Sequence, residues 1–420
     1  MHRRNDSNVL LKRLGIIGGL ILVALIIIFA IKVQSFYKTI YKTGNKNTTP
    51  VPSTKKIFTF VLMGYGGGAH EGTYLTDSIM VLHLDTEKNK ATLFSIPRDL
   101  WVKVPTKSGD AFHIKINALY QMNLFPKDFP DVDTGSATQA TLIKKVIRDI
   151  TGLPIDYYAT VDFAGFKEAI DTLGGIDVKV TKTFDDYSYP IDGKEKDLCG
   201  KDDQLHQIEP YLGGGLTAEQ EDAKKKLFEE KPELNDLYNQ INEESSEAFP
   251  CRYEHLHFEA GTVHMNGETA LKYVRSRHAL QDGGDFGRAA RQQQFIAAVK
   301  DKVISVGFIS KIFPLLDKLK DHISTDLDPA TLQRFIGEGT SLSTYKISNY
   351  VFSTDNVLQN SHSADGQYIL TSLDGEGEWQ SVHTVVKNVI AGITPTPTPG
   401  PTKIPTLVPA KKLPIPTETQ

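Results

Sequence analysis

Residues 91–103, which read ATLFSIPRDLWVK, favour an α/β fold with a ligand at one edge of its sheet. The apolar first half is typical of a buried strand, and Arg98 and Asp99 follow directly after it. Strand ends are where open α/β sheets place residues that bind ligands. Asp77 lies at the start of another apolar segment, residues 78–84, so we expect the two aspartates at neighbouring strand ends.

Two carboxylates beside basic residues suit a hard divalent cation that is shared with phosphate oxygens, which is how Mg²⁺ usually binds. Taken singly, Asp77 and Asp99 fit a cap or turn role equally well. The pair is therefore a candidate metal site if the fold brings both carboxylates together.

A second stretch, residues 273–295, concentrates arginine and glycine and reads YVRSRHALQDGGDFGRAARQQQF. Guanidinium groups stay charged and match phosphate oxygens bidentately, so clustered arginines suggest a multiply anionic ligand. After Gly287 the apolar spacing predicts a helix on which Arg288, Arg291 and Gln292 share one face. The start of that helix also favours anions through its backbone NH groups and its dipole. The alternative is a solvated, charged helix face.

Alternating strand and helix patterns predict a layered α/β domain with a mixed rather than purely parallel central sheet. The expected strands are residues 57–63, 78–84, 91–96, 157–162, 176–180 and 347–352. Besides the helix after Gly287, helices are expected at residues 136–151, which carry an apolar stripe, and at 379–390.

The two ends of the chain have compositions of their own. Residues 14–31 form an uninterrupted apolar run after several basic residues, which predicts a membrane anchor at 14–33 with residues 1–13 in the cytoplasm. A cleaved signal peptide is the alternative. Residues 34–56 are expected to form a tether, and the Pro- and Thr-rich residues 394–420 an extended tail. The predicted location is thus the cell membrane, single-pass, with the folded domain extracellular.

The overall composition fits a chain with a substantial folded core. Of its 420 residues, 40% are hydrophobic and 23% are charged. The net charge of −4 argues against nucleic acid as a partner, so the basic residues that matter are those in local clusters.

Six segments, in matching order and spacing, resemble the LytR-CpsA-Psr family: TDSIMVLHLD, ATLFSIPRDLWV, HIKINALY, GLPIDYYATVDFAGFKEAIDTLGGIDVKV, HMNGETALKYVRSRH and GDFGRAARQQQF. The resemblance implies one layered α-β-α catalytic domain at residues 57–393. Members transfer a glycosyl phosphate from a polyprenyl pyrophosphate-linked saccharide to an acceptor, usually a peptidoglycan sugar hydroxyl. In this family, helices such as that expected at 136–151 wall a tunnel for the polyprenyl tail, although ordinary core packing explains its apolar stripe equally well.

The resemblance also implies roles for particular residues. Asp77 and Asp99 would ligate Mg²⁺, with Mn²⁺ as an alternative metal. The pyrophosphate would be bound by six residues: Arg98, Lys115, Arg275, Arg277, Arg288 and Gln292. Arg288, Asp99 and Asp77 would be catalytic. In one departure, many members carry an arginine two residues before the first aspartate, where this chain has Leu75, which leaves head-group recognition open.

Residues 185–253 exceed what the family pattern needs and contain the only two cysteines of the chain, Cys199 and Cys251. Outside the cytoplasm such a pair is expected to form a disulfide; metal binding is less favoured because no further cysteines exist. The sequence from Thr217 to Gln220 fits a capping box and predicts a charged helix to about residue 244. A lid, an acceptor-binding flap and a decoration all fit this disulfide-closed helical insertion.

The resemblance predicts a Mg²⁺-dependent glycopolymer phosphotransferase. Its partners would be a polyprenyl-pyrophosphate-linked saccharide, the membrane, and peptidoglycan or another envelope acceptor. A protein that binds or senses lipid pyrophosphates without turnover is the alternative, and a hydrolase that uses water as acceptor is a third. A pure binder would need the arginines but would gain little from a metal pair, so Asp77 and Asp99 favour the enzyme.

Overall fold

The computed structural model describes residues 54–68, 72–135, 139–212, 215–243, 245–305, 315, 318–327, 331, 335 and 344–393. The predicted segments before residue 54, including the apolar run at 14–31, and the predicted tail at 394–420 lie outside these residues. A membrane span needs about 20 apolar residues. Within the described part of the chain, no helix is long and apolar enough to cross a membrane. This finding contradicts the predicted single-pass membrane location, which we therefore do not retain.

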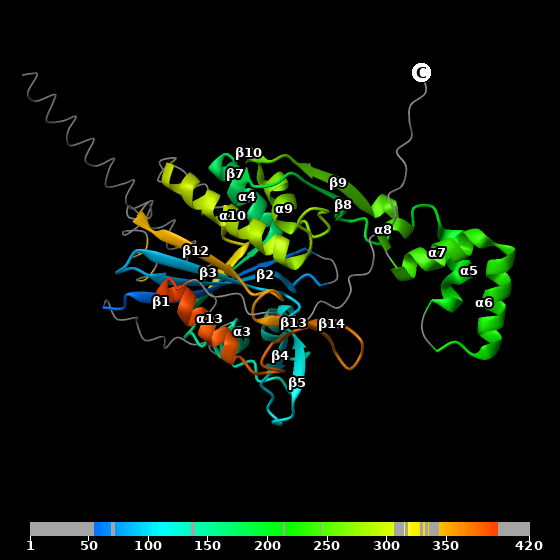
Figure 1. Ribbon diagram of the computed structural model, residues 1–420, viewed down its shortest axis with the longest axis horizontal. Helices are drawn as coiled ribbons and strands as arrows, with labels where there is room; N and C mark the ends of the chain where they lie inside the picture. The colour runs from blue at the N-terminus through cyan, green and yellow to red at the C-terminus, as the bar shows by residue number, and fades with distance from the viewer. Residues whose placement is uncertain are drawn as a thin grey trace, which may run out of the picture.

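A six-stranded mixed sheet forms the middle of the molecule (Figure 1), in the order β11-β6-β1-β2-β3-β12. β1 pairs antiparallel with β2, and β2 with β3, whereas β6 runs parallel to β1 and β12 parallel to β3. The predicted mixed sheet is thus confirmed. The strands are β1 (Ile57–Tyr65), β2 (Thr76–Asp85), β3 (Lys90–Ile96), β6 (Tyr157–Asp162), β11 (Ile323–Thr325) and β12 (Lys346–Val351).

One predicted strand of the sheet lies elsewhere. β7 (Ile176–Val180) pairs with β10 (Gly261–Met265) in a two-stranded ribbon outside the central sheet. Its residues alternate between buried and exposed, because one face packs on helices and the other meets solvent. That alternation is typical of a ribbon rather than of a strand covered on both sides.

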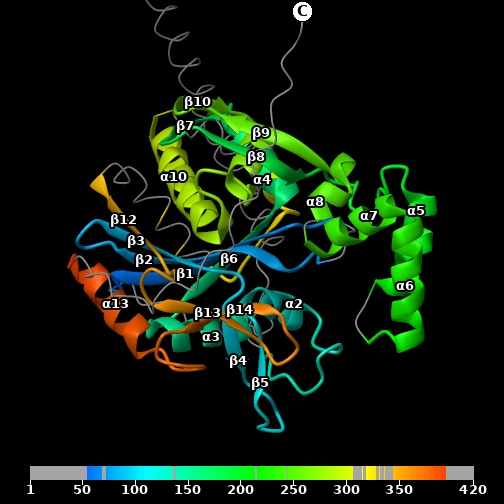
Figure 2. The same cartoon turned by 45° about the vertical axis from the view of Figure 1, so that its right-hand side comes forward.

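The main core lies on one face of the sheet, under two helices, α3 (Thr141–Thr151) and α13 (Gln380–Ala391) (Figure 2). The apolar stripe of α3 is buried in this core, where Ile143, Ile147 and Ile150 pack against the sheet. Smaller elements complete this layer: β4 (Trp101–Val104), β5 (Phe112–Lys115), a 3-10 turn (Ile116–Ala118), α2 (Leu119–Leu124), β13 (Leu358–His362) and β14 (Tyr368–Ser372).

The opposite face of the sheet carries three helices, α4 (Phe163–Leu173), α9 (Gly267–Arg275) and α10 (Gly284–Ser305), so the domain has α-β-α layers. These helices share a second core with β7, to which Ile170, Tyr273 and Phe295 contribute. α10 begins at Gly284, four residues before Arg288, where the sequence pattern predicted its start.

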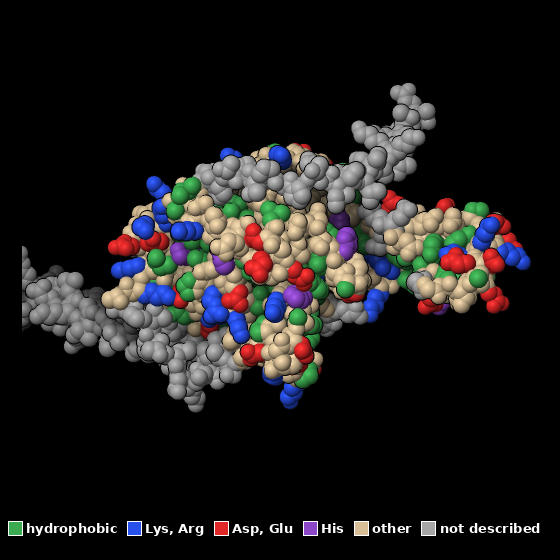
Figure 3. Space-filling model, turned by 60° about the horizontal axis from the view of Figure 1, so that its bottom comes forward, with side chains coloured by type: hydrophobic (Ala, Val, Ile, Leu, Met, Phe, Trp, Pro, Cys, Tyr) green, Lys and Arg blue, Asp and Glu red, His purple; other side chains and the backbone are tan. Residues whose placement is uncertain are grey.

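The insertion leaves the domain through an antiparallel ribbon of β8 (Phe184–Pro190) and β9 (Tyr253–Phe258). It ends in a helical lobe with its own small core around Ile208, Leu234 and Phe249. Figure 3 shows this lobe standing out from the body with acidic and basic side chains over its surface. Its helices are α5 (Asp202–Ile208), α6 (Ala218–Glu230), α7 (Pro232–Glu243) and α8 (Ser245–Ala248).

Two predictions for the lobe are confirmed and one is corrected. Cys199 and Cys251 form a disulfide. Thr217 caps α6 in a full capping box with Gln220. The expected single charged helix is instead two, because Pro232 lacks the backbone NH that a continuous helix would need there and starts α7 as a new helix.

Candidate active site

An apolar cavity of about 630 Å³ lies between the sheet and helices α4, α9 and α10. Strand alternation explains its lining, since neighbouring residues of a strand point to opposite faces. Val81 packs into the main core, whereas its neighbour Met80 faces the cavity. Other apolar side chains around the cavity include Leu62, Val161, Phe166, Ala169 and Ile296.

Helix α3 takes no part in this cavity. Its apolar residues lie in the main core on the other face of the sheet. Of the two interpretations of its stripe, core packing is therefore the one that the structure bears out. The apolar space is walled instead by α4, α9 and α10, because these helices stand over the face to which the alternate strand residues point.

Charged side chains from β2, β5 and the end of β3 gather beside the cavity, and Asp77 and Arg98 line it. β2 starts beside the end of β3, with Ile79 opposite Ile96, so Asp77 and Asp99 lie close together as the sequence predicts. Arg98 stands between them, with NH1 2.6 Å from Asp77 Oδ1 and Nε 3.7 Å from Asp99 Oδ2. Lys115, at the end of β5, places its Nζ 2.8 Å from Asp99 Oδ1.

Two arginines from residues 273–295 join these charged side chains through a carboxylate that they share. Asp285, in the first turn of α10, forms ion pairs with Arg277, whose Nε is 3.0 Å away, and with Arg288, whose NH2 is 2.8 Å away. The charge of Arg98 also acts on this carboxyl, which links the two halves of the group. We call these seven residues the mouth cluster: Asp77, Arg98, Asp99, Lys115, Arg277, Asp285 and Arg288.

The mouth cluster is partly withdrawn from water, and the pKa values of its buried members Arg288 and Asp285 are shifted. Burial lowers the pKa of Arg288 to about 10, opposed by Asp285 and reinforced by Arg277 and Arg98. Burial alone would raise the pKa of Asp285, but Arg288, Arg277 and Arg98 outweigh it and hold that pKa below its ordinary value. Arg288 and Asp285 are therefore both charged at neutral pH.

Arg275 and Gln292 border the same cavity but have structural contacts of their own. The Arg275 guanidinium lies 4.3 Å from the centre of the Phe163 ring and donates to the Tyr189 hydroxyl at 3.2 Å. Gln292 accepts from the Ser78 hydroxyl at 3.0 Å and donates to a backbone carbonyl of α9. Both side chains thereby hold the elements around the edge of the cavity in place.

Arg291 does not line the cavity with Arg288 and Gln292, although the three lie three and four positions apart on one helix. Its guanidinium is buried and turns to the loop between α9 and α10, where it pairs with Asp282 at 2.8 Å. It also donates to the carbonyl oxygens of Tyr273 and Ser276. Asp282 in this loop binds the Arg291 side chain near the start of α10. The spacing of residues along the helix does not reveal such a contact.

Asp285 was missed as a site residue by the sequence analysis. A signal existed, since Asp285 and Arg288 stand three positions apart on one helix and such a pair can meet. Its contact with Arg277 required the fold, because the two residues come from different elements.

The mouth cluster has the composition of an anion site. Its four basic side chains outnumber its three carboxylates, and Arg275 adds a further positive charge at the cavity. Guanidinium groups bind phosphate oxygens in fixed bidentate geometry. An apolar cavity that ends in such a cluster suits a ligand with an apolar tail and a multiply charged anionic head.

The amino-acid sequence is similar to those of known proteins. Residues 26–373 match the model of the LytR_cpsA_psr family. The chain is 28% identical over 334 residues to the polyisoprenyl-teichoic acid–peptidoglycan teichoic acid transferase TagV of Bacillus subtilis, covering 76% of this chain and 64% of TagV. It is 23% identical over 327 residues to the cell wall biosynthesis protein LcpA of Corynebacterium glutamicum, covering 75% of this chain and 47% of LcpA. The chain thus spans less than two thirds of the length of these relatives.

A crystal structure of a Streptococcus agalactiae protein has the same fold. It superposes with a TM-score of 0.51 at 18% sequence identity, covering 82% of this chain and 90% of that one.

Proposed function

The chain belongs to the LytR-CpsA-Psr family, and on that premise we propose that it is a glycopolymer phosphotransferase. It would take a glycosyl phosphate from a polyprenyl-pyrophosphate-linked glycopolymer and attach it to a cell-wall acceptor, such as a peptidoglycan sugar hydroxyl. One observation carries the proposal: an apolar cavity of about 630 Å³ adjoins a cluster of arginines and carboxylates that are partly or fully buried. The activity named for TagV supports it.

The two parts of the proposed substrate correspond to the two parts of the site. A polyprenyl chain is apolar, so its first isoprene units would enter the cavity and leave water. The pyrophosphate would then lie at the mouth, within reach of Arg98, Arg277 and Arg288. These guanidinium groups lose little water on binding it because the fold has already buried much of each one.

Three further residues have supporting roles in this proposal. Lys115 would contact the phosphates as a point charge, since its ammonium already lies beside Asp99. Arg275 would bind an outer phosphate oxygen from the rim of the cavity. Gln292 would position the start of α10 and offer its amide to the head group.

Asp77 and Asp99 fit a divalent cation, which we propose is Mg²⁺, with Mn²⁺ as the alternative. Both offer the hard oxygen ligands that these ions prefer, and both stand beside the arginines that would hold the phosphates. Each carboxylate has two oxygens, so Asp77 can keep its pairing with Arg98 and still ligate a metal. The bound ion would neutralise charge on the pyrophosphate oxygens.

The proposed reaction is a phosphoryl transfer. The acceptor hydroxyl oxygen forms a bond to the phosphorus that carries the saccharide, and the bond from that phosphorus to the bridging oxygen breaks. Polyprenyl phosphate leaves with the bridging oxygen, and the proton of the acceptor hydroxyl passes to the surrounding water. Arg98, Arg277 and Arg288 stabilise the charge that develops on the phosphate oxygens, which is the main requirement of such a transfer.

The test uses the full chain with a polyprenyl pyrophosphate saccharide and a peptidoglycan oligomer, analysed by mass spectrometry with Mg²⁺ present. We expect a glycosyl-phosphate adduct on the oligomer, and we expect Asp77→Asn to abolish it without lowering the melting temperature. Release of polyprenyl phosphate without an adduct would indicate a hydrolase. Binding of the lipid without any turnover would replace the transferase by a sensing protein.

A further inference from the structure

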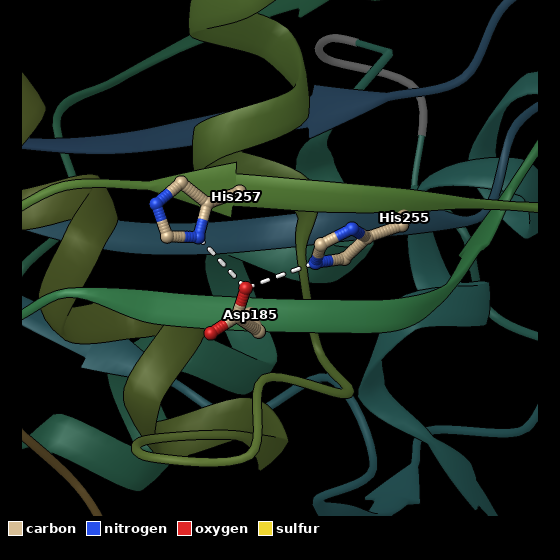
Figure 4. Close-up of side chains that lie close together, drawn as sticks. All are labelled: Asp185, His255 and His257. Atoms are coloured by element: carbon tan, nitrogen blue, oxygen red, sulfur yellow. Dashed lines mark hydrogen bonds and ion pairs between the residues drawn. The ribbon is translucent and has the colours of Figure 1, made fainter. Parts of the chain in front are cut away.

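A second group of charged side chains lies on the ribbon of β8 and β9, outside the cavity. Asp185 on β8 faces His255 and His257 on β9, and Figure 4 shows both imidazole rings turned toward its carboxylate. Asp185 Oδ1 lies 2.7 Å from His257 Nδ1 and 2.9 Å from His255 Nε2. The three ligand atoms that these side chains offer are within 4.8 Å of one another. We call Asp185, His255 and His257 the ribbon cluster.

Strand geometry explains why these three side chains meet. His255 and His257 are two residues apart, so they project from the same face of β9. Asp185 is the direct cross-strand partner of His257 in the antiparallel register. The arrangement rests on two paired strands, which bring the three side chains together before anything binds.

The groups around the ribbon cluster orient its two imidazoles. His257 Nε2 lies 3.1 Å from Glu259 Oε1, and Glu259 is held in turn by the Thr183 hydroxyl at 2.9 Å. A carboxylate that accepts from one imidazole nitrogen leaves the other free to ligate a metal, which is the common outer arrangement of metal-binding histidines. The ring of His255 is fixed differently, by stacking on Tyr187 with the ring centres 4.1 Å apart.

We propose that the ribbon cluster binds one Zn²⁺ ion through Asp185 Oδ1, His255 Nε2 and His257 Nδ1. Two histidines and one carboxylate are a usual zinc ligand set, with a fourth position left to water. Tetrahedral ligands at zinc lie about 3.3 Å apart, given metal–ligand bonds near 2.0–2.1 Å. The two observed separations need to open by about 0.6 and 0.4 Å, which side-chain rotation can supply.

A simple ion pair is the competing explanation, and the protein contains one for comparison. On the ribbon of β7 and β10, His264 Nδ1 lies 2.7 Å from Asp177 Oδ1, also across two strands and exposed. That pair has a single histidine, whereas the ribbon cluster has two on one carboxylate oxygen and a further carboxylate behind one of them. His264 therefore serves as a matched control.

The proposed site would connect the insertion to the mouth of the cavity. Asp186, next to Asp185, is fully buried and accepts from the Ser276 hydroxyl at 2.6 Å and the His278 backbone NH at 3.1 Å. Ser276 and His278 flank Arg277 of the mouth cluster. A metal that ties β8 to β9 at Asp185 would therefore hold the strand that supports this arginine.

The experiment titrates Zn²⁺ into the untagged, metal-free full chain and measures binding by calorimetry and by competition with a chromophoric zinc indicator. We expect one ion per chain, with His264→Ala unchanged. Glu259→Gln should weaken binding by about 10–100-fold, as loss of an outer carboxylate usually does. His257→Ala should weaken it more than that, because it removes a direct ligand.

A second readout separates loss of the site from loss of the fold. Zn²⁺ should raise the melting temperature of the wild type and of His264→Ala, but not that of His257→Ala or Asp185→Asn. Because both replaced side chains are at least partly exposed, the metal-free variants should melt near the metal-free wild type. Equal zinc affinity in the wild type and His257→Ala, or no saturable binding by the wild type, would overturn the proposal.

Discussion

The two faces of the central sheet are lined with similar apolar side chains but differ in how completely they are packed. Under α3 and α13 the residues interlock in the main core, with Ile143 and Ile147 fully buried. Under α4, α9 and α10 an apolar space of about 630 Å³ remains. Empty apolar space gives up packing energy, because the atoms around it lack partners. A protein that stabilises itself on one face can leave the other hollow for a ligand, and we infer that this division underlies the function.

Shortening one isoleucine on each face tests whether the two faces are packed differently. Ile147→Ala should lower the free energy of unfolding by about 2–5 kcal/mol, because it leaves a cavity in a filled core. Ile296→Ala, which borders existing space, should cost at most about 2 kcal/mol, mainly from lost apolar burial. Urea unfolding of both variants measures the difference. Equal losses would show that the two faces are packed alike.

Arg288→Ala tests the charged end of the hollow face. Loss of a guanidinium that stabilises the transferring phosphate should reduce kcat by about 10²–10³-fold. Arg288→Lys should recover only part of the activity, since a lysine keeps the charge but not the bidentate fork. Arg148→Ala, on the exposed side of α3, is the matched control and should leave both activity and stability unchanged. An Arg288→Ala variant with normal turnover would remove this residue from the mechanism.

The difference between the two faces was partly visible in the sequence. The apolar stripe of α3 and the apolar strands were visible as patterns, and the positions of Asp77 and Asp99 at strand ends predicted that the two residues meet. Whether an apolar face is filled or hollow depends on how far the helices stand from the sheet, which no local pattern records. No local pattern records the partner of Arg291 either, because that partner lies in a loop. Nor does the spacing of His255 and His257 by itself indicate a site, because their partner Asp185 is brought to them by the strand register.

Asp285→Asn tests the carboxylate that Arg277 and Arg288 share. Because the folded-state pKa of Asp285 is held below its unfolded value, the charged form stabilises the fold at pH values above that unfolded value. The variant should therefore be less stable than the wild type at pH 7, by about 1.5–3 kcal/mol for a charged hydrogen bond. The gap should persist down to about pH 4 and close as the pH falls further, through the folded-state pKa. Chemical unfolding at several pH values measures it; a gap that widens in acid would contradict the assignment.

Ala169→Phe addresses the hollow face without touching a charge. Ala169 lies on α4 and faces the cavity, so a larger side chain there would occupy space that we assign to the polyprenyl tail. We expect KM for a long-chain lipid pyrophosphate saccharide to rise by about tenfold, which corresponds to about 1.4 kcal/mol of lost apolar contact. A substrate with only one or two isoprene units should be affected much less, because its tail is too short to reach the added ring.

Comparing the long-chain and short-chain substrates distinguishes the possible causes of a change in KM. If the Ala169→Phe substitution merely disturbed α4, both substrates would lose turnover alike and the melting temperature would fall. If the tail binds elsewhere, neither KM would change, and the reason for leaving one face of the sheet unfilled would have to be sought in a different ligand. A selective loss with the long chain is the outcome that ties the hollow face to the lipid, and it would explain why a sheet with two apolar faces is packed on only one of them.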